Sequence, residues 1–272
     1  MIKIKNLNYK FKTNNFSLSN INLEIKDNEF VCVIGKNGSG KSTLSKILAG
    51  LINFKDGEIF INGINLKDKK SFLDLRKQVS IVFQNPETQI IFDTVYDELK
   101  FSIKNILKNQ TSKDKELDSI IIESLTKVGM QNFINTPTSE LSLGQKQKIA
   151  IATAICTSPK VLILDEPTTM LDPVSKHQIY SILKQLQANG ITIIFITNNI
   201  DEILYSDRIL ILENGNLKHD FLKKDLFNHK DDLKDFYVPS LLSLLFDLKE
   251  KGKNIDLENF DINKLSDYFD LN

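Results

Sequence analysis

Apolar and polar residues alternate near the start of the chain. Apolar side chains occupy every second or third position over 2–7 and again over 21–25, with a polar turn at 12–15 between them. A period close to two is typical of strands that bury one face. The pattern therefore predicts β-structure over roughly the first 30 residues.

Short apolar runs follow at 30–34 and 161–164, and they fit strands buried on both faces; a further strand is predicted at 191–197. Helical periodicity appears between such runs, over 42–49 and 174–189, and each helix is predicted to end at a glycine. Strands that alternate with helices predict an α/β protein, with a parallel sheet and helices on its faces.

Two segments depart from this alternation. Residues 86–145 hold a charged stretch at 113–118 and helical periodicity at 120–128, which predicts an inserted helical subdomain over about 86–145. Residues 221–272 are charged and rich in leucine, and the leucines between 241 and 248 predict an amphipathic helix. We expect this C-terminal extension either to help dimerisation or to pack on the preceding domain, residues 1–220.

Composition narrows the classes of function. Lys plus Arg equals Asp plus Glu at 35 each, and this neutrality argues against a general nucleic-acid binder. No stretch approaches the roughly 18 apolar residues of a membrane-spanning helix, so we expect any membrane contact to be peripheral. Cys32 and Cys156 lie in apolar runs and are interpreted as buried thiols in a reducing cytosol.

The glycine-rich turn after residues 30–34 carries a phosphate-binding motif. It fills the GxxxxGK[ST] pattern between an apolar strand and a helix. Successive backbone N–H groups and the helix start favour phosphate, Lys41 reaches the β- and γ-phosphates, and Ser42 holds Mg²⁺. The nucleotide-binding candidates of this loop are Gly35, Lys36, Asn37, Gly38, Ser39, Gly40, Lys41, Ser42 and Thr43.

Two adjacent carboxylates end the apolar run at 161–164. Asp165 is expected beside the phosphate loop, where it supports Mg²⁺. Glu166 points elsewhere and polarises the attacking water. A solvated strand end is the alternative, and the phosphate loop argues against it. The expected cofactors are therefore ATP and Mg²⁺.

The residues between these motifs resemble those of ATP-binding cassette (ABC) ATPases. Residues 141–145, Leu-Ser-Leu-Gly-Gln, are similar to the LSGGQ signature, Gln84 to the Q-loop glutamine, Asp172 to the D-loop aspartate and Phe11 to the aromatic that stacks on adenine. The resemblance covers about residues 1–220. It implies a P-loop NTPase fold, with a RecA-like parallel sheet core, an N-terminal antiparallel β subdomain and an inserted helical subdomain.

The resemblance also implies how the site is assembled. Two subunits sandwich ATP head to tail, so that Ser142 and Gly144 of one contact the γ-phosphate bound by the other. Phe11, Gln145 and Asp172 are further nucleotide-binding candidates. The catalytic candidates are Glu166, Lys41, Gln84 and Asn198. The metal-binding candidates are Ser42, Gln84 and Asp165.

Longer stretches resemble one group within this family. Residues 82–89 and 165–173 are similar to those of energy-coupling factor transporter ATPases, and Gln-Asn-Pro at 84–86 resembles the first of their two ATPase subunits. The implied partners are a second ABC ATPase subunit, in a hetero- or homodimer, a transmembrane coupling protein and a small substrate-binding membrane protein. The implied location is the cytoplasmic face of the cell membrane, and the implied cargo is a vitamin or a cobalt or nickel ion.

Two positions depart from the family pattern. Leu143 replaces the second signature glycine, and its side chain either crowds the phosphate contact or points away. Asn198 stands where the family has a switch histidine, and an amide cannot carry charge. We therefore expect slow hydrolysis at this chain's own site, although Glu166 and Gln84 could suffice. The histidines that are present, expected to be exposed rather than catalytic on a helix or in the tail, are His177, His219 and His229.

Three other functions stay open at this stage. The chain could serve another ABC importer with conventional permeases, and the ATPase chemistry would be the same. A non-transport ABC ATPase of DNA repair or translation is disfavoured, because the chain has one cassette and no long coiled-coil insertion. A structural or regulatory role without hydrolysis draws support only from Asn198 and Leu143.

Overall fold

The computed structural model describes residues 1–10, 17–106, 114–236, 240–258 and 260. The adenine-stacking prediction for Phe11 and the turn predicted at 12–15 lie outside these residues. Among the described residues, no helix is long and apolar enough to cross a membrane.

The N-terminal half of the chain contributes an antiparallel sheet in the order β2-β1-β4-β5. Its strands are β1 (Ile2–Lys10), β2 (Ser17–Ile25), β4 (Asp56–Ile61) and β5 (Ile64–Asn65). The alternating apolar residues of β1 and β2 face inward and are buried, because a strand turns successive side chains to opposite faces. The predicted antiparallel β subdomain is confirmed.

A second, six-stranded sheet has the order β10-β9-β3-β8-β7-β6. Five strands are parallel, namely β3 (Phe30–Ile34), β6 (Val79–Val82), β7 (Val161–Asp165), β8 (Thr192–Thr197) and β9 (Arg208–Glu213). Every residue of β3, β7 and β8 is buried, which explains why these strands consist mostly of apolar residues.

Two elements were missed by the sequence analysis. Strand β10 (Asn216–Leu222) pairs antiparallel with β9 through a tight turn at Asn214 and Gly215, both of which have positive φ. An Asn-Gly pair is a recognisable hairpin signal. Helix α2 (Phe72–Gln78) buries only Leu75, so it shows little helical periodicity.

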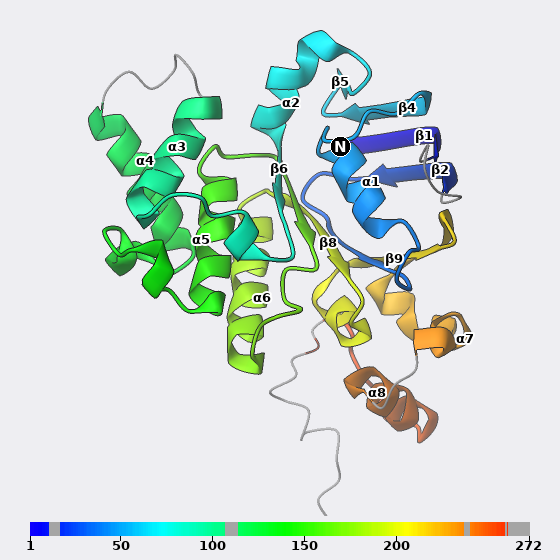
Figure 1. Ribbon diagram of the computed structural model, residues 1–272. Coiled ribbons are helices and arrows are strands. Elements are labelled where there is room, and N and C mark those ends of the chain that lie inside the picture. The colour runs from blue at the N-terminus through cyan, green and yellow to red at the C-terminus, as the bar shows by residue number, and fades with distance from the viewer. Residues whose placement is uncertain (11–16, 107–113, 237–239, 259, 261–272) are drawn as a thin grey trace, which may run out of the picture.

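Two hydrophobic clusters lie on opposite faces of the six-stranded sheet. Strand β3 shows the division, since Phe30, Cys32 and Ile34 join one cluster while Val31 and Val33 join the other. The second cluster also includes the antiparallel sheet and α1 (Lys41–Leu48). The first includes α6 (Pro173–Ala188) and the helical subdomain (Figure 1).

The helical subdomain contains α3 (Val95–Ile106), α4 (Asp114–Lys127) and α5 (Leu143–Ile155). Helix α5 runs past residue 145 into the core, where Ile149 and Ile151 are fully buried. It therefore links the subdomain to the sheet. Short 3₁₀ helices fill the connections η1 (Lys69–Ser71), η2 (Pro86–Thr88), η3 (Gln131–Phe133), η4 (Thr138–Glu140) and η5 (Ile200–Tyr205).

The C-terminal extension packs on the same chain. It comprises η6 (Lys223–His229), α7 (Lys230–Leu233), η7 (Lys234–Phe236) and α8 (Leu241–Glu250). The predicted amphipathic helix is α8, whose leucines join the first hydrophobic cluster, and the backbone N–H of Leu242 donates to the Asp201 carboxylate at 3.0 Å. The role of the extension in dimerisation stays a prediction. The boundary between residues 1–220 and 221–272 also stays a prediction, and it falls within β10, which runs to Leu222.

Candidate nucleotide site

The phosphate loop joins the end of β3 to the start of α1. Gly38 (φ 78°) and Gly40 (φ 109°) adopt left-handed conformations that other residues rarely reach. Gly40 is the N-cap of α1, and it has no side chain that could accept a hydrogen bond from the first turn of that helix. The N–H groups of this turn are thus left to an external acceptor such as a phosphate.

Lys41 lies at the bottom of this loop and is buried. Its Nζ donates hydrogen bonds to the carbonyl oxygens of Gly35 at 2.7 Å and Lys36 at 3.2 Å. Burial lowers the pKa of Lys41, and the negative charges of Glu166 and Asp165 oppose that shift. The loop therefore holds the ammonium group beside the position where phosphates would lie.

Two side chains with oxygen atoms that could bind a metal ion, Ser42 and Asp165, meet next to Lys41. The Ser42 hydroxyl donates to Asp165 Oδ1 at 3.0 Å, and the Ser45 hydroxyl lies 3.4 Å from Asp165 Oδ2. Burial raises the pKa of Asp165, while the hydrogen bond from Ser42 and the charge of Lys46 lower it. A hydroxyl and a carboxylate at this spacing fit Mg²⁺, which prefers oxygen ligands. Ser45 was missed, although it lies one helical turn after Ser42.

The second carboxylate, Glu166, is contacted from two other loops. Gln84 Nε2 donates to Glu166 Oε2 at 3.2 Å, and Asn198 Nδ2 donates to Glu166 Oε1. Glu166 has a φ of 52°, an unusual backbone conformation that turns it away from the direction of Asp165. Glu166 also lines the same cavity of about 330 Å³ as Lys41. Glu166 therefore brings Gln84 and Asn198, which bind it, close to the phosphate loop.

A buried network holds the loops that carry Glu166 and Asn198. Glu202 is 3% exposed and accepts hydrogen bonds from Thr168 at 2.7 Å, Tyr180 at 2.6 Å and Thr197. Thr168 follows Glu166, and Thr197 precedes Asn198. Sequence reasoning missed Glu202, because nothing local distinguishes it from a surface glutamate.

The signature residues form part of a different structure. Ser142 is the N-cap of α5 and forms a capping box with Gln145. Leu143 is half-buried and packs against the first hydrophobic cluster, which favours the alternative in which its side chain points away from phosphate. Among the described residues, the lining of the phosphate-loop cavity includes none of the signature.

Gly144 and Asp172 connect the signature to α6. A Cβ atom on Gly144 would lie 2.5 Å from Ser175 Oγ, so the two helices pack too closely for a side chain there. The Asp172 carboxylate caps α6 by accepting hydrogen bonds from the N–H groups of Val174 and Ser175, both at 3.0 Å. The Ser175 hydroxyl, and after it the Ser175 N–H, lower the pKa of Asp172.

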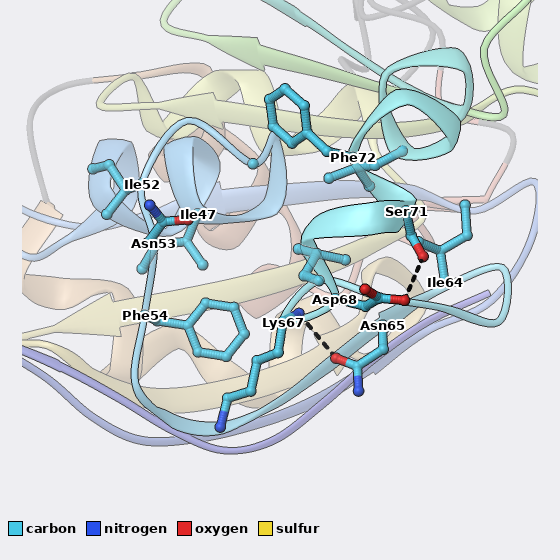
Figure 2. A pocket seen from close by; sticks show the side chains of 13 residues that line it. Ile47, Ile52, Asn53, Phe54, Ile64, Asn65, Lys67, Asp68, Ser71 and Phe72 are labelled. Atoms are coloured by element: carbon cyan, nitrogen blue, oxygen red, sulfur yellow. Dashed lines mark hydrogen bonds between the residues drawn. The ribbon is translucent and has the colours of Figure 1, made fainter.

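A larger cavity, of about 460 Å³, lies between α1, β5 and α2 (Figure 2). Its walls combine apolar side chains, among them Phe54, Ile64 and Phe72, with polar ones. Its one carboxylate, Asp68, accepts a hydrogen bond from the Ser71 hydroxyl at 3.1 Å. Among the residues that the structure describes, no predicted site residue lines this cavity, so size alone does not identify the nucleotide site.

Residues 18–169 match the family model described as "ABC transporter", which spans more than half of the chain. This chain belongs to the ABC transporter family. The ABC chain is 38% identical over 265 residues to the energy-coupling factor transporter ATP-binding protein EcfA1 of Fusobacterium nucleatum, covering 97% of each protein. It is also 38% identical to the EcfA1 protein of Oceanobacillus iheyensis, covering 94% of this chain and 91% of that protein.

Solved ABC structures have the same fold. The cbiO1 protein of Clostridium perfringens, described as part of the ABC transporter complex cbiONQ, is 32% identical with a TM-score of 0.78. The alignment covers 92% of this chain and 98% of cbiO1. The ATP-binding cassette MJ0796, solved in a post-hydrolysis state with ADP and Pi, is 29% identical with a TM-score of 0.72, over 82% of this chain and 98% of that one.

These similarities confirm several predictions for this ABC protein. The P-loop NTPase fold, ATP binding and hydrolysis, and the likeness to the first ATPase subunit of energy-coupling factor transporters are all confirmed. The roles of the individual site residues stay predictions.

Proposed function

We propose that this ABC ATPase drives an energy-coupling factor importer from the cytoplasmic face of the membrane, with Mg²⁺ as the partner of ATP. The observation that carries the proposal is the convergence of Lys41, the Ser42–Asp165 pair and Glu166 around one cavity. Similarity to the EcfA1 proteins over nearly the full length supports the transporter type.

In the proposed mechanism, the α1 N-terminus and Lys41 bind the phosphates. Ser42 and Asp165 would hold Mg²⁺, which would supply positive charge beside the phosphates. The Glu166 carboxylate accepts a hydrogen bond from the attacking water and polarises it. Gln84 fixes the orientation of that carboxylate, since it already donates to one of its oxygens at 3.2 Å.

Asn198 is proposed to make this chain's own site slow. Its amide holds the second oxygen of Glu166 but stays neutral, so it supplies no positive charge to a developing phosphate charge. A partner site would then carry much of the turnover. This idea favours a heterodimer in which the two sites are unequal.

The second ATPase subunit is proposed to face the phosphate loop with its signature. Ser142 of this chain is exposed at the start of α5 and lies outside its own nucleotide cavity. Its free face is therefore available to ATP bound by another subunit. In a head-to-tail pair, the signature of each subunit would face the ATP bound by the other.

The transmembrane coupling protein is proposed to bind near the Q-loop. A groove of about 220 Å³ lies there between Leu51, Arg76, Gln89 and Ser102, and the side chain of Leu51 is 47% exposed. The Glu87–Lys146 ion pair, at 2.6 Å, joins the Q-loop to α5 and hence to the signature. Closure on ATP would thus shift the groove. The small substrate-binding membrane protein would select the vitamin or metal-ion cargo.

The test is to tag the chain in its native membrane and identify what co-purifies in mild detergent. We expect a second ABC ATPase, a multispanning membrane protein and one small membrane protein. Two conventional permease domains would instead place the chain in another importer, and ribosomal or DNA-repair proteins would overturn the transport role.

The ATPase activity of the same complex tests the chemistry. Glu166→Gln in both subunits, at this position and its counterpart, should lower the rate by about 10²- to 10⁴-fold while ATP binding persists. Glu250→Gln, which changes an exposed carboxylate on α8, is the matched control and should leave the rate unchanged.

A further inference from the structure

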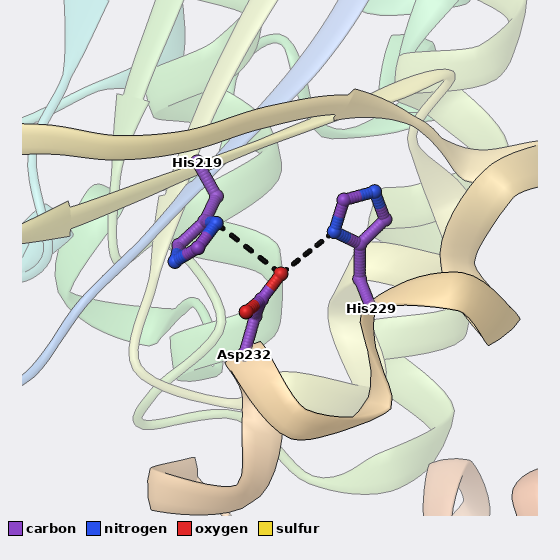
Figure 3. Close-up of side chains that lie close together, drawn as sticks. All are labelled: His219, His229 and Asp232. Carbon is purple, nitrogen blue, oxygen red and sulfur yellow. Dashed lines mark hydrogen bonds and ion pairs between the residues drawn. The ribbon is translucent and has the colours of Figure 1, made fainter.

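Three potential metal ligands converge where the central sheet meets the C-terminal extension. His219 lies on β10, His229 ends η6, and Asp232 lies on α7. Figure 3 shows both imidazole rings directed at the Asp232 carboxylate. His229 Nδ1 is 2.7 Å and His219 Nδ1 is 3.2 Å from Asp232 Oδ2. These two histidines are thus neither simple surface residues nor part of the nucleotide site.

The spacing of these atoms fits a small divalent ion. One ligand atom from each residue lies within 4.8 Å of the other two. Zn²⁺ binds nitrogen and oxygen at about 2.0–2.2 Å, so tetrahedral ligands lie roughly 3.3 Å apart. The two nitrogen–oxygen distances, 2.7 Å and 3.2 Å, lie close to this separation. We propose that His219, His229 and Asp232 bind a divalent transition-metal ion, with Zn²⁺ the best match and water as the fourth ligand.

Two features hold the ligands in place before any ion binds. The His229 ring stacks on the buried Phe221 ring, with centroids 3.8 Å apart and planes 9° apart. His219 is fixed by its position in the β9–β10 ladder, opposite Ile211. Rigid ligands lose little conformational freedom on binding, and this favours affinity.

The ligand types distinguish this site from the proposed Mg²⁺ site. Imidazole nitrogen suits Zn²⁺, Ni²⁺ or Cu²⁺, whereas Mg²⁺ prefers oxygen ligands alone. The surrounding charges do not favour a cation strongly, because Lys36 and Lys218 line the small cavity beside His219, together with Glu213. The site therefore depends on its two nitrogen ligands rather than on negative charge.

A bound ion would fasten the extension to the cassette. It would join β10, at the edge of the central sheet, to α7 through ligands that come from different elements. An ion that binds the folded chain and not the unfolded one stabilises the folded state. Zn²⁺ should therefore raise the melting temperature of the whole protein.

The experiment uses the full chain, stripped of metal with chelator, and titrates it with ZnCl₂ by calorimetry and in thermal unfolding. The wild type should bind one equivalent and melt at a higher temperature with Zn²⁺. His219→Gln and Asp232→Asn should each weaken binding by at least about tenfold and abolish the shift. The matched control is His177→Gln, because His177 is the remaining histidine and lies exposed on α6.

Co²⁺ gives an independent readout of the coordination. The wild type and His177→Gln should show the visible absorption of a four-coordinate Co²⁺ ion, and His219→Gln should lose it. The circular dichroism of each variant shows whether it is folded; if His219→Gln is not, Asp232→Asn decides. The proposal is overturned if the wild type binds no Zn²⁺, or if folded His219→Gln or Asp232→Asn binds it as the wild type does.

Discussion

Asn198, after β8, donates a hydrogen bond to the carboxylate of Glu166, after β7. Adjacent parallel strands bring the two residues together, although they are far apart in the sequence. The position that the family usually gives to a histidine is therefore occupied by a neutral group that already binds the proposed catalytic carboxylate. This contact makes the contribution of Asn198 measurable.

Asn198→His should raise the ATPase rate of the assembled complex by about tenfold. A charged donor forms a hydrogen bond roughly twice as strong as that of an amide, and 1.4 kcal/mol corresponds to a factor of ten. Steady-state hydrolysis by wild-type and variant complexes measures the change, with ATP affinity determined alongside. An unchanged rate at equal ATP affinity would argue against slow hydrolysis caused by Asn198.

Asp165→Asn should stabilise the nucleotide-free chain at neutral pH and remove its Mg²⁺ response. Because burial raises the pKa of Asp165 above its value of 3.8 in the unfolded chain, the folded state binds the proton more tightly. The stability contribution of this group therefore falls as pH rises from 3.8 through the raised pKa, and the charged form is the costly one at pH 7.

Thermal unfolding with and without Mg-ATP tests this prediction for Asp165→Asn. The variant should melt above the wild type without ligand and gain less from Mg-ATP. Asp201→Asn, a change to a carboxylate for which no Mg²⁺ role is proposed, is the control for Mg-ATP stabilisation. If Asp165→Asn kept the full Mg-ATP shift, the proposed metal role of Asp165 would be wrong.

Glu202→Ala should destabilise the fold by about 3 kcal/mol and slow ATP hydrolysis. The substitution leaves three hydroxyl groups without their acceptor, and each buried unsatisfied group costs about 1–3 kcal/mol. Tyr180→Phe removes one of these donors and should cost about 1 kcal/mol. Urea denaturation gives the free energy of unfolding of both variants. An equal loss of stability in the two would contradict a shared network.

If Glu202 positions the catalytic loops, Glu202→Ala must lower kcat by a larger factor than it lowers the affinity for ATP. Thr168 and Thr197 hold the loops that carry Glu166 and Asn198, so loosening them misplaces the carboxylate without touching the phosphate loop. Separate measurements of kcat and of ATP binding decide this. A fall in affinity alone would point to a purely structural role.

Gly144→Ala should cost about 1–3 kcal/mol through a contact within the chain. Its new Cβ would lie 2.5 Å from Ser175 Oγ and 3.0 Å from Ser175 Cβ, and overpacking of this kind forces the helices apart. Adding Ser175→Gly should restore part of the stability lost. Chemical denaturation of the single and double variants gives the coupling, and an additive result would exclude the steric explanation.

Much of the fold follows from local patterns. The runs at 30–34 and 161–164 became β3 and β7 because continuous apolar stretches of this length belong between helical layers. Strand β10 and helix α2 were missed because both have mixed polarity: β10 is an edge strand, and α2 buries only Leu75. The positions of β10 and α2 depend on the elements that pack against them.

Local patterns in the sequence predict the phosphate loop, Lys41, Ser42 and the strand that ends in Asp165. These features are set by neighbouring residues, whose spacing fixes the local backbone and chemistry. No local pattern predicts the three contacts that the packed chain shows, namely Asn198 with Glu166, Gly144 with Ser175 and His219 with Asp232. Such contacts depend on the order in which strands and helices pack, and that order is set by burial of the whole chain rather than by any one segment.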